Sequence, residues 1–108
     1  MARISRGDAP LYVYFARDLV TGFIKIGYSW NPARRIRSLR RETDGHSIEL
    51  LAVARGNHLT EGKLHHLFRD DLAGRGREWF RSSPALEALI EFIREFQAVK
   101  PSPVAGVA

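Results

Sequence analysis

Two short segments near the start of the chain constrain its fold more than any other feature. Residues 11–16 and 23–28 are both rich in aromatic and β-branched side chains, which favour strands. The six residues between them, 17–22, include an aspartate and a glycine, as turns commonly do. The sequence therefore predicts a β-hairpin. A six-residue loop gives a register in which Tyr14 lies opposite Lys25.

The rest of the chain predicts one further strand and three helices. Helices are expected over residues 32–42, 58–72 and 84–97, with a largely buried strand over 48–54. The last helix should bury an apolar stripe made of Leu86, Leu89, Ile90, Ile93 and Phe96. We therefore predict an α+β fold, in which a small three-stranded antiparallel sheet, an N-terminal β-hairpin plus a third strand, packs with about three helices.

A chain of 108 residues has room for one modest hydrophobic core. Residues 1–9 are polar and basic and residues 100–108 lack periodicity, so we expect flexible ends around a single domain at 10–99. No apolar run is long enough to span a bilayer, and the first residues do not resemble a signal peptide. We therefore expect a cytoplasmic protein with no membrane partner.

The charge and cysteine content narrow the chemistry. There is no cysteine, which excludes disulfides, thiolate metal sites and cysteine nucleophiles. Lysine and arginine number 17 against 12 acidic residues, giving a net charge of +5, and 14 of the 17 are arginine. Because the planar guanidinium suits phosphate, this bias indicates a polyanionic partner.

Five arginines gather on the predicted helix at 32–42. Four of them point away from its apolar stripe, whereas Arg35 lies at the edge of the stripe and can lean toward the sheet. Phosphate contact is the interpretation we favour for the four outer arginines, which are Arg34, Arg37, Arg40 and Arg41. The alternative for any one arginine is a surface ion pair, for example with Glu42 or Asp44.

Glu61 falls on the apolar stripe of the helix predicted at 58–72, an unfavourable place for a charge. Such a carboxylate needs a cation, a metal ion or hydrogen bonds, and His65 one turn later is its nearest candidate neighbour. The alternative is an exposed residue stabilised by the helix dipole. The four histidines lack a zinc spacing, but a lone carboxylate with water and a phosphate suits Mg²⁺ or Mn²⁺.

These pieces together resemble the GIY-YIG endonuclease superfamily. The resemblance rests on Tyr12-Val-Tyr14, Lys25-Ile-Gly27, Arg35 and Glu61, in that order over residues 11–93. It is closest to the small phage and bacterial branch with a K-I-G second motif, through the added segment Glu78-Trp-Phe80. The chain departs from that pattern at Lys25, Leu39 and Glu78, where relatives carry tyrosine, histidine and asparagine.

The resemblance implies a metal-dependent endonuclease that hydrolyses DNA phosphodiester bonds. It makes Tyr14 the general base, places Arg35 on the phosphate, assigns one divalent cation to Glu61 and keeps His65 as its neighbour. Lys25, if it faces Tyr14, would lower the pKa of the phenol. The alternative for Tyr12 and Tyr14 is ordinary sheet packing, and for Trp79 and Phe80 we favour core packing.

Two other classes of function stay open. One is a noncatalytic DNA-binding module on the same scaffold, and the other is a protein-interaction domain. The expected partner is DNA, branched or double-stranded. The 108 residues show no obvious separate recognition domain, so a homodimer or a larger protein partner is a candidate source of specificity.

Overall fold

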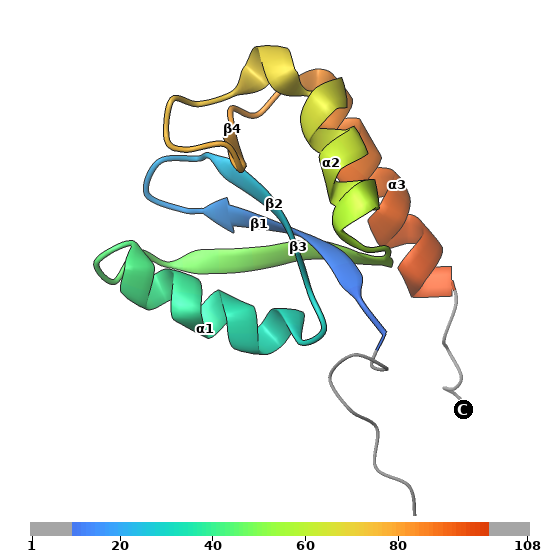
Figure 1. Ribbon diagram of the computed structural model, residues 1–108, viewed down its shortest axis with the longest axis horizontal. Coiled ribbons are helices and arrows are strands. Elements are labelled where there is room, and N and C mark those ends of the chain that lie inside the picture. The colour runs from blue at the N-terminus through green and yellow to red at the C-terminus, as the bar shows by residue number, and fades with distance from the viewer. Residues whose placement is uncertain (1–9, 100–108) are drawn as a thin grey trace, which may run out of the picture.

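The structure is a computed structural model that describes residues 10–99. An α+β fold with an antiparallel sheet is confirmed (Figure 1). The elements are β1 (Tyr12–Asp18), β2 (Ile24–Ser29), α1 (Pro32–Glu42), β3 (Ile48–Arg55), α2 (His58–Leu67), the short 3₁₀ helix η2 (Arg69–Asp71), β4 (Trp79–Phe80) and α3 (Pro84–Val99). Both predicted flexible ends, 1–9 and 100–108, lie outside the described residues.

The sheet has four strands in the order β3-β1-β2-β4, one more than predicted. The extra strand β4 has only two residues, Trp79 and Phe80, which pair with Lys25 and Ile24 of β2. A two-residue strand leaves no periodicity to read in a sequence. Both aromatic side chains are buried, as the core-packing interpretation predicted.

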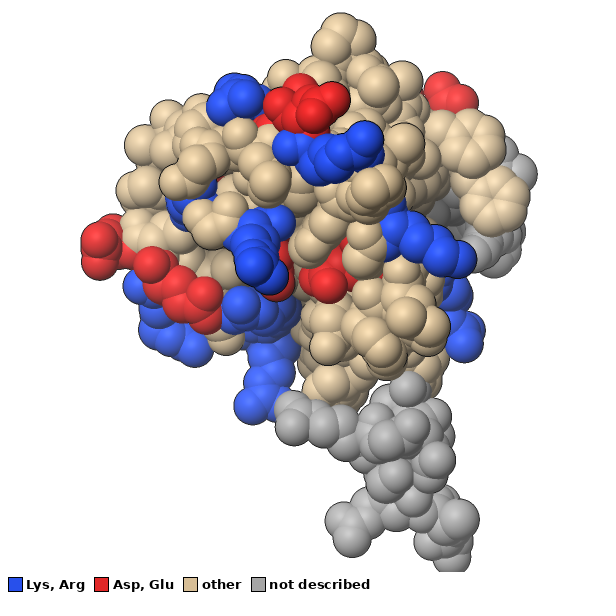
Figure 2. Space-filling view, turned by 45° about the horizontal axis from the view of Figure 1, so that its top comes forward, with Lys and Arg blue, Asp and Glu red and all other residues tan. Residues whose placement is uncertain are grey.

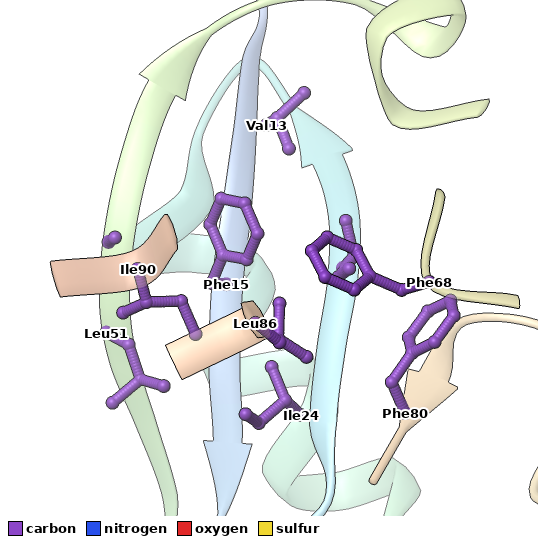
Figure 3. Packing of buried hydrophobic residues seen from close by; sticks show 10 residues of the cluster. Val13, Phe15, Ile24, Leu51, Phe68, Phe80, Leu86 and Ile90 are labelled. Atoms are coloured by element: carbon purple, nitrogen blue, oxygen red, sulfur yellow. The ribbon is translucent and has the colours of Figure 1, made fainter. Parts of the chain in front are cut away.

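Helices cover both faces of the sheet (Figure 1). On one face, Ile36 and Leu39 of α1 pack with Tyr14, Ala16 and Ile48. On the other, a larger core joins the sheet to α2, α3 and the segment between them, and Figure 3 shows its side chains meeting over β1 and β2. Its most buried members are Val13, Phe15, Ile24, Ile26, Phe80 and Leu86. The sheet is therefore the middle layer of three.

The predicted hairpin register is wrong by two residues. Tyr14 pairs with Gly27, and Lys25 pairs with Ala16. The strands extend to a backbone bond from Asp18 N to Phe23 O at 2.9 Å, so the loop has four residues instead of six. A shift by two leaves every side chain on the same face of the sheet, but it moves Lys25 away from the position opposite Tyr14.

Asp18 tightens this loop from inside the protein. Its carboxylate is fully buried and accepts hydrogen bonds from the backbone N–H groups of Val20 and Thr21. It also accepts from His46 Nδ1 at 2.7 Å and Arg75 at 2.9 Å. Burial opposes its ionisation, but these hydrogen bonds prevail and lower the pKa of Asp18 from 3.8 to about 2.

This buried carboxylate should make the fold sensitive to acid. Because the folded-state pKa lies below the ordinary value, the stabilisation is complete above about pH 4 and is lost as the pH falls toward 2. We expect a loss of about 2 kcal/mol in the free energy of unfolding across that window. Asp18→Asn should be less stable at pH 7 by a similar amount and lack this dependence. Urea unfolding at several pH values measures both, and parallel pH profiles for the two proteins would contradict the assignment.

Two predictions about the helices need correction. The helix predicted over 58–72 ends at Leu67, and η2 continues the chain to Asp71. Phe96, placed on the buried stripe of α3, is 63 % exposed, because the sheet covers only the part of that stripe around Leu86 and Ile90. Among residues 10–99, no helix is long and apolar enough to cross a membrane.

Candidate active site

The candidate site forms around Ile26 and Gly27 of β2, where the strand extends past the two residues paired with β4. The backbone N–H of Ile26 donates to the carbonyl of Glu78 at 3.0 Å. Its carbonyl accepts from His65 Nε2 on α2 at 2.8 Å. These two hydrogen bonds along the edge of β2 hold Glu78 and His65, which come from distant segments of the chain, beside the same residue.

Tyr14 reaches this point by crossing over Gly27. An added Cβ at position 27 would lie 2.5 Å from the Tyr14 hydroxyl oxygen, so only glycine lets the ring lie there. Tyr14 itself is 1 % exposed and packs beside Ile36 and Leu39. The sheet-packing interpretation is therefore correct for the ring, while the hydroxyl interacts with the charged groups of the site.

Arg35 comes from α1, whose N-terminus is set by the Asn31 side chain accepting from Arg34 N and by Pro32 in its first turn. Its guanidinium donates to Glu42 Oε2 at 2.6 Å and lies close enough to the Tyr14 hydroxyl to oppose the rise in the pKa of Tyr14. Both alternatives raised for this arginine are therefore present, the surface pair and the lean toward the sheet. Arg35 has a raised pKa, chiefly from the bond to Glu42.

Glu61 lies in the first turn of α2, which Asn57 and Thr60 cap reciprocally. Its side chain is only 12 % exposed, and an oxygen lies 3.9 Å from His65 Nε2. Burial raises the pKa of Glu61, and the nearby charge of Glu78 adds to this, while His65 and Lys25 oppose it. This carboxylate is a half-buried charge that a cation would stabilise.

Lys25 does not serve the purpose predicted for it. It is buried, forms an ion pair with Glu78 and lies over the Trp79 ring, 5.6 Å from its centroid. The expected lowering of the Tyr14 pKa by Lys25 is wrong because the register separates the two residues. Burial instead raises the pKa of Tyr14 to about 12, against the opposing effect of Arg35.

Glu78 is the site residue that sequence reasoning undervalued. It appeared only as part of the Glu78-Trp-Phe80 segment and as a departure from an expected asparagine, with no role of its own, yet it pairs with Lys25 and raises the pKa of both Tyr14 and Glu61. Its signal was a lone carboxylate directly before two core aromatics, Trp79 and Phe80. Such a residue is held at the edge of the core with little freedom to move away.

The outer arginines of α1 are exposed, as predicted, but they differ in their contacts. Arg40 donates to the carbonyl of Ile48 at 3.1 Å, and so ties α1 to β3. Arg41 lies 3.5 Å from the Ser38 hydroxyl, at the limit of a hydrogen bond. The face drawn in Figure 2 carries basic side chains on both sides of a recessed acidic patch. Arg34 and Arg37 are thus the better candidates for phosphate contact.

The donor set decides which metal ion could fit. Within residues 10–99 there is no group of three or more histidine, aspartate or glutamate side chains that could hold a metal ion. Zinc takes three or four protein ligands, whereas Mg²⁺ or Mn²⁺ retains water and needs one or two carboxylates. If the domain holds such a cation, Glu61 is its candidate ligand, because a cation would offset the burial and the nearby charge of Glu78 that disfavour its carboxylate form.

The fold and site define a small α+β domain with a buried phenol, an arginine and a half-buried carboxylate meeting at a sheet edge. A family model, the T5orf172 domain, matches residues 11–97, and the chain belongs to this phage-associated family. The resemblance to the GIY-YIG superfamily is therefore wrong, since the matching family is a different one. No curated protein and no solved structure matches the chain.

The GIY-YIG resemblance arose from motifs that many hairpins share. The motifs behind the resemblance are short, and aromatic residues, a lysine and glycines recur in many hairpins for reasons of packing and turn geometry. The roles given to Tyr14, Arg35 and Glu61 by that resemblance lose their family support. Any role for these residues now depends on their contacts in the structure.

Proposed function

We propose that this domain is a metal-dependent endonuclease that hydrolyses DNA phosphodiester bonds at the edge of β2. The observation that carries the proposal is the convergence on Tyr14 of Arg35 and Glu61, which come from two other elements and whose charges both act on the Tyr14 hydroxyl. A proton acceptor, a phosphate-binding cation and a carboxylate for a metal ion are the groups that phosphodiester hydrolysis uses.

Arg35 would bind the phosphate in place of the Glu42 carboxylate. Its pair with Glu42 is at the surface, with the two side chains 34 % and 53 % exposed, so it contributes little to stability. Two phosphate oxygens can accept the same pair of parallel hydrogen bonds as a carboxylate, and the guanidinium would stay close to the Tyr14 hydroxyl. Arg34 and Arg37 on the same helix add attraction for neighbouring phosphates.

Tyr14 would accept the proton of the attacking water, and Glu61 would hold a divalent cation. The cation supplies Lewis-acid stabilisation of the developing charge on the phosphate oxygens. His65 positions Glu61, because its bond to the carbonyl of Ile26 fixes its ring beside the carboxylate. Glu78 holds Lys25, which keeps this buried ammonium paired.

The test is cleavage of supercoiled plasmid and of branched oligonucleotides with Mg²⁺, with Mn²⁺ and with a chelator. Product that requires a metal ion and disappears in chelator supports the proposal. A protein that binds these DNAs with a steep salt dependence but cuts none of them with either metal contradicts it.

That second outcome describes the other candidate function, a noncatalytic DNA-binding module. One observation favours it: with a pKa of about 12, Tyr14 is almost entirely protonated near neutral pH, so very little phenolate is present to accept a proton. The exposed arginines would then be the functional surface and the buried cluster a structural one.

Release of Arg35 from Glu42 gives a separate prediction. We expect Glu42→Gln to tighten DNA binding about threefold at low salt, because Arg35 then binds the phosphate without first breaking its ion pair with Glu42. The control is Glu91→Gln, which removes the same charge from an exposed position on α3. Fluorescence anisotropy with a labelled duplex measures both. Equal affinity gains in the two variants would mean that only net charge matters.

A further inference from the structure

A hollow beside the candidate site combines an exposed aromatic ring with two arginine side chains. It lies between the end of β2 and the first turns of α1, and is lined by Ser29, Trp30, Asn31, Arg34, Arg35 and Ser38. Arg35 belongs both to this hollow and to the group around Tyr14. Whatever occupies the hollow is therefore next to the proposed scissile phosphate.

The two tryptophans of the chain have contrasting surroundings. Trp79 is buried, with the Arg75 guanidinium 3.9 Å and Lys25 Nζ 5.6 Å from its ring centroid. Trp30 is 38 % exposed and shares its hollow with two guanidinium groups. An aromatic face beside arginines binds a nucleobase and its phosphate together.

We infer that Trp30 is a stacking platform for an unpaired nucleobase, with Arg34 and Arg35 on the adjoining phosphates. In a duplex each base is stacked between its neighbours, so a protein ring reaches a base face only where the nucleotide is unpaired or turned out. This inference rests on the proposed function and specifies its substrate: DNA with an unpaired nucleotide next to the cleaved bond, as at a branch, a frayed end or a single strand.

The charge of the hollow agrees with such a ligand. Arg34 is exposed, and its backbone N–H is already taken by the Asn31 side chain, so its contribution comes from the guanidinium. No acidic side chain lines the hollow among the residues described. The Ser29 hydroxyl accepts from Asn31 N at 2.9 Å, which sets the turn that presents Trp30. The lining thus combines one aromatic surface with cations and small polar groups.

The test is a binding measurement in chelator, where cleavage is absent. Wild type, Trp30→Leu and Trp30→Phe are titrated with labelled oligothymidylate and with a labelled duplex. We expect Trp30→Leu to weaken binding of the single strand by about tenfold or more and to leave duplex affinity within about twofold, while Trp30→Phe retains most single-strand affinity. Phe92→Leu, another exposed aromatic on α3, is the matched control and should change neither.

Fluorescence provides a second measure. Oligothymidylate should quench the tryptophan emission of the wild type but not that of Trp30→Leu, in which only the buried Trp79 emits. Equal losses for single strand and duplex, or no loss for either, would overturn the stacking platform. Those outcomes leave metal-dependent plasmid cleavage intact, whereas failure of cleavage alone would overturn the proposed enzyme and leave the binding result standing.

Discussion

Glu61→Gln is expected to reduce metal-dependent DNA cleavage on the order of 100-fold or more, with no loss of thermal stability. Loss of a carboxylate that holds a catalytic cation removes several kcal/mol of transition-state stabilisation, and each 1.36 kcal/mol is about tenfold in rate. Stability should not fall, because burial raises the pKa of Glu61 and so disfavours its charged form in the folded protein. Glutamine keeps the shape and removes that charge.

This combination separates a catalytic role from a structural one. Cleavage rates are measured with plasmid at several Mg²⁺ concentrations, and unfolding temperatures by circular dichroism. Glu91→Gln, which removes one exposed charge from α3, should cut at the wild-type rate. If Glu61→Gln cleaves as well as wild type, Glu61 does not hold the cation. If it unfolds many degrees lower, the carboxylate supports the fold instead.

Tyr14→Phe is expected to lower the cleavage rate by about 100-fold or more and to remove its dependence on pH. General base catalysis typically contributes that much, and phenylalanine keeps the ring over Gly27 while it loses the hydroxyl. The fold should lose only about 1 kcal/mol, since Arg35 retains its bond to Glu42.

The pH dependence follows from the direction of the shift. A base acts only when deprotonated, and a pKa of about 12 leaves roughly one phenolate in 10⁵ molecules at pH 7. If Tyr14 is the base, the wild-type rate should therefore rise about tenfold per pH unit between about pH 7 and pH 9. Single-turnover rates across that range test this. A wild-type rate that is flat with pH, or a rise that persists in Tyr14→Phe, would assign the proton to another group.

Sequence patterns were most informative for elements whose signals are local. The helix at Pro32–Glu42 was predicted to its ends, because Asn31, Pro32 and an unbroken run of helix-forming residues act within the element itself. The two hairpin strands were likewise predicted from their own aromatic and β-branched residues, even though the register between them was wrong. The exposed position of four arginines on α1 followed in the same way from helical geometry.

Contacts between distant segments were the part that patterns could not supply. Lys25 was assigned to Tyr14 by counting along a loop, but the buried Asp18 shortens that loop, and Lys25 pairs with Glu78 instead. Neither contact has a local signature, since the ion-pair partner lies 53 residues away. Assignment to a family from short motifs failed for a related reason, because packing and turn geometry produce the same residues in unrelated hairpins.

The sequence by itself determined the α+β class, the hairpin, the basic helix and the apolar position of Glu61, because each depends on residues a few positions apart. Only the tertiary structure decided that Tyr14 crosses Gly27, that Arg35 bonds Glu42 while its charge acts on Tyr14, and that Glu78 completes the charged cluster. The tertiary structure also decided the pKa values of Tyr14 and Glu61. Burial and neighbouring charges set them, and both exist only after the sheet and its two helical layers have packed.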